Sequence, residues 1–96
     1  MIGLEDVKKI LRENRSHLFA DYPIKELAIF GSFARGEAGE DSDIDIMVEF
    51  SQPVGFEIVD LVEELEELLQ HKVDIVSKKA IRPNMMPFVE KDLVYV

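Results

Sequence analysis

The chain has 96 residues, of which 47% are hydrophobic and 32% are charged, and its 20 acidic and 11 basic residues give a net charge of -9. We expect one globular domain spanning residues 1–96, because a chain of this length can bury one hydrophobic core and no second lobe. The acidic balance, without a basic stripe, disfavours direct binding to nucleic acid and favours cations, metal-bound nucleotides or a basic partner protein.

The sequence contains neither cysteine nor an obvious membrane signal. Because cysteine is absent, thiolate metal sites, thiol catalysis and disulfides are excluded. No apolar run reaches the ~20 residues that are needed to span a bilayer, and no basic-then-apolar leader is visible. We therefore expect a cytoplasmic protein without membrane contact.

The hydrophobic pattern alternates between helical and strand periods along the chain. In chain order it predicts a helix over residues 4–19, strands over 27–30 and 43–50, a helix over 56–69, and strands over 72–76 and 92–96. Between the last two strands, Pro83 and Pro87 bracket a short irregular or helical stretch. These elements predict an α/β fold in which helices pack on a small mixed sheet.

Asp43 and Asp45 stand at alternate positions where the strand over residues 43–50 begins. In a strand, residues i and i+2 project from the same face, with Cα atoms roughly 6.5–7 Å apart. Carboxylates at that spacing can flank a pair of divalent ions ~3.5–4 Å apart, the arrangement used for in-line phosphoryl displacement. Because hard oxygen ligands suit Mg²⁺, the two aspartates predict a site for two magnesium ions.

A glycine–serine turn precedes these aspartates by about a dozen residues. Gly31 allows the backbone to approach a ligand closely, and Ser32 offers a hydroxyl at the start of a short helical turn, which is an anion-binding position. Arg35 follows and could contact a phosphate or a partner, although a solvated arginine fits as well. A phosphate cradle beside a metal face is what phosphoryl and nucleotidyl transfer require.

Asp74 is the natural third carboxylate. It lies between Val73 and Ile75 in an apolar strand that is expected to pair beside the strand over residues 43–50, and an aspartate in such a strand needs a partner or a function. It could complete the metal site and accept the proton of an attacking hydroxyl. An isolated D-x-D is weak evidence, but its combination with the turn and with Asp74 is far more specific.

Other polar and apolar clusters have less specific interpretations. The carboxylates of the helix over residues 56–69 are most simply a solvated face. Because Glu66 and Glu67 lie where the helix dipole disfavours negative charge, a hypothesis is that this face docks a basic partner. Lys78 and Lys79 could reach a triphosphate or simply aid solubility. Met85, Met86 and Phe88 form an apolar patch that is either core or a contact between copies of the chain. His17 and His71 have no ligand pattern and are interpreted as surface or boundary residues.

The stretch GSFARGEAGEDSDIDIMVEF resembles the signature of the polymerase-beta-type nucleotidyltransferase superfamily, with Gly-Ser, then Arg-Gly, then Asp-x-Asp opening a strand. The strand KELAIF before it and the acidic helix and VDIV after it follow the order of the minimal nucleotidyltransferases. The resemblance implies the polymerase-beta-like fold, with Gly31 and Ser32 for phosphate, Asp43 and Asp45 for metal, and Asp74 as third carboxylate.

The resemblance also implies an activity and a partner. Family members transfer a nucleoside monophosphate from a nucleoside triphosphate to a hydroxyl, with Mg²⁺ and release of pyrophosphate. Minimal members resemble antitoxins that adenylylate a tyrosine of a HEPN-type toxic ribonuclease, which predicts ATP and such a helical toxin as the partners here. Two alternatives stay open: a binding module that neutralises its partner by occlusion, and an enzyme that modifies a small-molecule hydroxyl.

Overall fold

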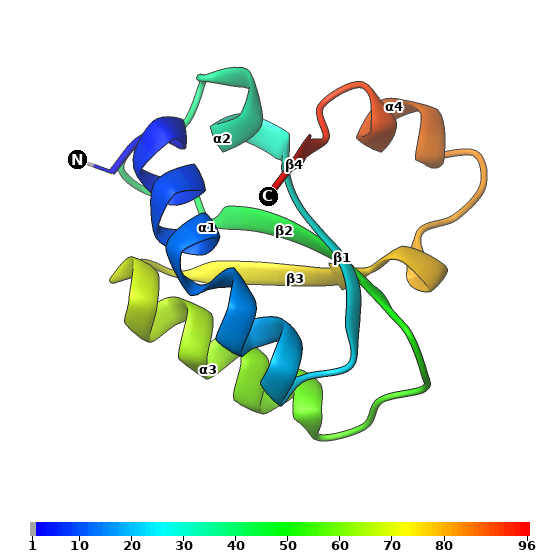
Figure 1. Ribbon diagram of the computed structural model, residues 1–96. Helices are drawn as coiled ribbons and strands as arrows, with labels where there is room; N and C mark the ends of the chain where they lie inside the picture. The colour runs from blue at the N-terminus through cyan, green and yellow to red at the C-terminus, as the bar shows by residue number, and fades with distance from the viewer. Residues whose placement is uncertain (1) are drawn as a thin grey trace.

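Helices and strands alternate along the chain in the predicted order (Figure 1). The computed structural model describes residues 2–96. In chain order the elements are α1 (Leu4–Asp21), β1 (Ile24–Phe30), α2 (Gly31–Arg35), β2 (Ile44–Phe50), α3 (Glu57–Leu69), β3 (Val73–Ser77), the 3-10 turn η1 (Lys78–Ala80), α4 (Met86–Glu90) and β4 (Val94–Tyr95). Strand β1 begins three residues before the predicted start, since Ile24 is buried and pairs with Phe50 across an irregularity in the register.

The strands form one mixed sheet in the order β3-β2-β1-β4. Strand β1 is antiparallel to both β2 and β4, whereas β2 and β3 are parallel. Parallel neighbours need a crossover connection, and α3 provides it between β2 and β3. This crossover is what places the beginnings of β2 and β3 at the same end of the sheet.

Helices α1 and α3 cover one face of the sheet and enclose the core with it (Figure 1). In β2 the predicted alternation holds, with Ile44, Ile46 and Val48 fully buried in this core. On α3, Leu61, Leu65 and Leu69 recur at helical spacing and are buried against the same cluster.

The second face of the sheet is covered at one end only. Met47 lies on this face and is fully buried, where the alternation alone would have left it exposed. On this side of the chain η1 contacts β2, and Lys78 lies 3.8 Å from a carboxylate oxygen of Glu26 and 3.7 Å from one of Glu49. The other end of this face, where β2 and β3 begin, keeps its aspartates accessible to solvent.

Carboxylates of the acidic helix α3 take part in the fold itself. The Glu66 carboxylate accepts a 3.0 Å hydrogen bond from the backbone N–H of Val73 and so ties the end of α3 to the start of β3. This hydrogen bond explains why a carboxylate stands near the end of α3, so the position of Glu66 no longer indicates a basic partner. Glu67 stays exposed, and for its side chain the docking hypothesis stays a prediction.

None of the helices that the structure describes is both long enough and apolar enough to cross a membrane.

Candidate active site

Three predicted carboxylates lie near one another where β2 and β3 begin. The parallel register places Asp45 directly beside Asp74, and the antiparallel register places Phe30 on the other side of Asp45. Residues paired in register on neighbouring strands point to the same face, with the strands about 4.8 Å apart. Strand β2 begins at Ile44, one residue later than predicted, so Asp43 lies in the loop just before it. Asp43 is exposed, as is Asp74, while Asp45 is half-buried. The structure thus brings together the three aspartates that the sequence analysis singled out.

The electrostatics of Asp45 reflect this crowding. Burial raises the pKa of the Asp45 carboxyl above its ordinary value, and the nearby carboxylates of Asp74 and Asp43 raise it further. The Arg35 guanidinium acts in the opposite direction and lowers the pKa of Asp45. Negative charge is therefore held here against its own repulsion, and a bound cation would relieve that repulsion.

We expect Asp45→Asn to stabilise the fold near neutral pH in the absence of divalent ions. An aspartate with a raised pKa binds its proton more tightly in the folded chain, so its stabilising contribution is present below the unfolded pKa and is lost as pH rises through the folded pKa. Asparagine removes that loss. Because Asp45 is half in contact with water, we expect only about 1 kcal/mol, or roughly 4 °C in Tm.

The measurement is thermal unfolding with a chelator present, near neutral pH and at about pH 3, where the carboxyl of the native chain is protonated as well. The two proteins should differ at the higher pH and converge at the lower one. Glu13→Gln, an exposed change of the same charge, is the control and should shift Tm little. Equal melting of Asp45→Asn and the native chain near neutral pH would show that water screens the three carboxylates.

Gly31 packs directly against Asp45. Its φ of +74° lies in the left-handed region, and a β-carbon at this position would collide with the Asp45 carboxylate. The sequence analysis had interpreted Gly31 as room for a ligand, whereas the structure shows that the first group to use this room is Asp45 itself. The Gly31–Ser32 turn and the carboxylates are therefore one continuous surface, with Ser32 half-buried at the start of α2.

Arg35 is held by two carboxylates from the same chain. Its Nη1 donates to Asp92 Oδ2 at 2.6 Å and its Nε donates to Glu37 Oε2 at 3.1 Å. These hydrogen bonds, that of Asp92 foremost, raise the pKa of the Arg35 guanidinium. To contact a phosphate, Arg35 would have to give up its hydrogen bonds to Asp92 or Glu37. The sequence analysis missed Asp92, because nothing in the sequence marks a pairing across 57 positions.

The lysines after β3 lie away from the three aspartates. Lys78 is four positions beyond Asp74 along the strand direction, about 13 Å at strand rise, and its ammonium lies beside Glu26 and Glu49. Lys79 lines a different pocket, together with Phe50 and Pro53. Their predicted reach to a triphosphate gains no support from this arrangement.

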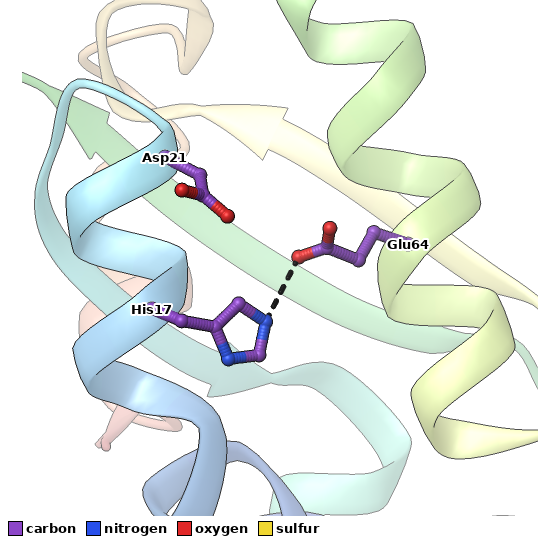
Figure 2. Close-up of side chains that lie close together, drawn as sticks. All are labelled: His17, Asp21 and Glu64. Atoms are coloured by element: carbon purple, nitrogen blue, oxygen red, sulfur yellow. Dashed lines mark hydrogen bonds and ion pairs between the residues drawn. The ribbon is translucent and has the colours of Figure 1, made fainter.

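The donor set of the three aspartates fits a divalent cation. Carboxylate oxygens from one short region, one of them with a raised pKa caused in part by its neighbours, are the hard ligands that Mg²⁺ takes. A second acidic group lies elsewhere: Figure 2 shows His17 and Asp21 of α1 beside Glu64 of α3, with a 3.2 Å contact between His17 Nε2 and Glu64 Oε2. That group belongs to the helical layer on the opposite face of the sheet, so it is separate from the candidate active site.

The comparison with known protein families agrees with this geometry. The model of the family described as nucleotidyltransferase domain matches residues 4–96. The chain belongs to this family. The predictions of a nucleotidyltransferase enzyme and of its α/β fold are therefore confirmed, and the carboxylates described above lie within the matched region.

This nucleotidyltransferase has curated relatives of the same length. It is 46% identical over 100 residues to a Methanocaldococcus jannaschii protein provisionally named a protein adenylyltransferase, and the alignment covers all of both chains. It is 38% identical over 97 residues to the protein adenylyltransferase MntA of Thermococcus cleftensis, across all of this chain and 98% of the relative.

Solved structures share the fold of this nucleotidyltransferase. A protein provisionally described as a minimal nucleotidyltransferase matches with a TM-score of 0.84 and 34% identity, covering 99% of this chain and 97% of the other. A more distant chain comes from the complex of a tri-AMPylated Shewanella oneidensis HEPN toxin with its MNT antitoxin. It has a TM-score of 0.58 and 20% identity and covers 96% of this chain and 66% of the other, and this likeness concerns the fold alone.

Proposed function

We propose that this nucleotidyltransferase moves AMP from ATP to a tyrosine hydroxyl of a HEPN-type toxin and thereby acts as the antitoxin. The observation that carries the proposal is the in-register pairing of Asp45 with Asp74 beside the Gly31–Ser32 turn. The names of the relatives support adenylyl transfer to a protein, and the Shewanella complex supports a HEPN toxin as the protein that bears the acceptor tyrosine.

Each side chain has a distinct part in this reaction. The Ser32 hydroxyl donates to the triphosphate, and the absence of a side chain at Gly31 leaves the carboxylates of Asp43 and Asp45 next to those phosphates. Asp74 accepts the proton of the attacking tyrosine hydroxyl. The tyrosine oxygen then bonds to the α-phosphorus, the bond from that phosphorus to the bridging oxygen breaks, and pyrophosphate leaves.

Mg²⁺ is the cation that the proposal assigns to Asp43, Asp45 and Asp74, with two ions expected. When bound, it supplies positive charge against the phosphates and against the developing charge of the displacement. Without a cation, four phosphate charges and three carboxylates would repel one another across the same surface. The proposal therefore requires that transfer depends on a divalent ion.

Two further candidate functions compete with this proposal. The first is transfer to a small-molecule hydroxyl, and the names of the relatives as protein adenylyltransferases favour a protein acceptor over it. Neutralisation by occlusion alone would need no aspartates, yet three are held together at an electrostatic cost. That cost favours an enzyme over a purely occluding antitoxin.

Mass spectrometry of a HEPN-type partner tests the proposal directly. The partner is incubated with this protein, Mg²⁺ and an equal mixture of the four nucleoside triphosphates. We expect a mass increment of AMP, located on a tyrosine peptide and absent when a chelator replaces Mg²⁺. An increment of another nucleotide would correct the base, and an unmodified partner that is nevertheless inhibited would favour occlusion.

A further inference from the structure

A pocket opens beside the Gly31–Ser32 turn, on the side away from Asp74. Its volume is about 390 Å³, and its walls come from two segments that are far apart in the sequence. The end of β1 and α2 contribute Phe30, Gly31 and Arg35, and α4 with the residues after it contributes Phe88, Val89, Lys91 and Asp92. In Figure 1 these segments, α2 and α4, stand near each other at one end of the sheet.

This pocket is continuous with the carboxylate site. Gly31 lines the pocket and also packs against Asp45. Only this residue therefore separates a molecule bound at the aspartates from the pocket. Arg35 likewise lines the pocket and is close enough to Asp45 to lower the pKa of its carboxyl. The Arg35–Asp92 ion pair at 2.6 Å joins the two walls of the pocket.

The walls combine apolar surface that suits a flat aromatic group with the charged side chains of Arg35, Lys91 and Asp92. Phe30, Phe88 and Val89 present apolar surface, and the guanidinium of Arg35 is already satisfied by Asp92 and Glu37. Phe88 is 64% exposed, so its ring contributes little to the core and is free for stacking. Exposed aromatic rings that line a pocket are stacking surfaces for nucleic bases.

The order of the strands separates donor from acceptor. Asp74 on β3 and the pocket beside β1 lie on opposite sides of Asp45 on β2. Because the proposed acceptor hydroxyl lies next to Asp74, the pocket on the other side of Asp45 is left free for a part of the nucleotide.

We propose that this pocket holds the base of the nucleoside triphosphate, stacked on Phe88, and so makes Phe88 a specificity-determining residue. This inference rests on the proposed function, since it needs a nucleotide at the aspartates. A purine presents more surface to the ring than a pyrimidine, so ATP and GTP should bind more tightly than CTP and UTP. Phe88 should not contribute to the binding affinity of the triphosphate tail.

Calorimetric titrations with Mg²⁺ test the inference by comparing ATP with inorganic triphosphate, which lacks a base. We expect Phe88→Ala to bind ATP about tenfold more weakly than the native chain and inorganic triphosphate equally well. Phe88→Tyr should keep the affinity for ATP, because its ring stacks in the same way. Phe56→Ala is the matched control, as Phe56 is 89% exposed at the start of α3 and lines no part of this pocket.

Three results would overturn the inference and are distinguishable from one another. Unchanged ATP binding by Phe88→Ala, with weaker transfer to the toxin, would place the acceptor in the pocket instead. An equal loss for ATP and inorganic triphosphate would make Phe88 a support of the turn. If the native chain binds neither compound, the proposed function itself fails and the inference fails with it.

Discussion

Replacing Asp43 and Asp45 by asparagine should lower the rate of AMP transfer by about three orders of magnitude or more, while the chain stays folded. Divalent ions at such sites supply several kcal/mol of transition-state stabilisation, and each 1.36 kcal/mol is tenfold in rate. Asparagine keeps the shape of both side chains but removes their charge, so the loss should come from charge neutralisation. The measurement is transfer of radiolabelled AMP to the partner at saturating ATP.

The same double variant separates catalysis from occlusion. Glu5→Gln with Glu13→Gln on α1 removes the same charge from two exposed positions and should leave transfer unchanged. If the Asp43→Asn, Asp45→Asn chain binds the partner and still suppresses its toxicity, occlusion is the function. Undiminished transfer by this chain would refute the assignment of the site.

Gly31→Ala should destabilise the fold by about 2 kcal/mol or more and also lower transfer by about a hundredfold. A left-handed φ costs any other residue about 1–2 kcal/mol, and the new methyl group would collide with the carboxylate of Asp45. Either the strands separate slightly or Asp45 moves, and misplacement of a reacting group by about 1 Å can cost this much rate. Urea unfolding measures the first effect and label transfer the second.

A second glycine isolates the contact from the backbone strain. Gly36 has a φ of +72°, close to that of Gly31, but a β-carbon there would meet no atom within 4 Å. Gly36→Ala should therefore show only the backbone cost and keep transfer. Combining Gly31→Ala with Asp45→Ala should recover part of the lost stability, since the two changes share one contact. Equal unfolding free energies for Gly31→Ala and Gly36→Ala would show that the Asp45 side chain can move away from the new methyl group without destabilising the fold.

Some of the contacts on which these two experiments depend could be predicted from the sequence, and others could not. The strand β2 and the buried face formed by Ile44, Ile46 and Val48 follow from alternation, because a strand repeats every two residues wherever it lies. Likewise the buried stripe of α3 follows from the helical period. The pairing of β2 with β3 was an expectation, but the register that sets Asp45 against Asp74 is a property of the assembled sheet.

Local pattern failed where a residue's partner is remote in sequence. Met47 is buried on the face that alternation leaves to solvent, Arg35 donates a hydrogen bond to Asp92, and Glu66 accepts one from the backbone N–H of Val73. For each of these residues, the sequence pattern predicts a position on the surface and does not indicate the distant partner. No periodicity encodes which distant segment will cover it.

The amino-acid sequence by itself determined most elements of this protein and the nucleotidyltransferase class, because these depend on local periods and on a compact motif. The tertiary structure alone decided that Asp45 lies in register with Asp74, that Gly31 must lack a side chain because of Asp45, and that Phe88 borders a pocket beside the turn. Such contacts depend on how the sheet closes and where the chain's last segment returns, and their energies exist only once distant residues meet.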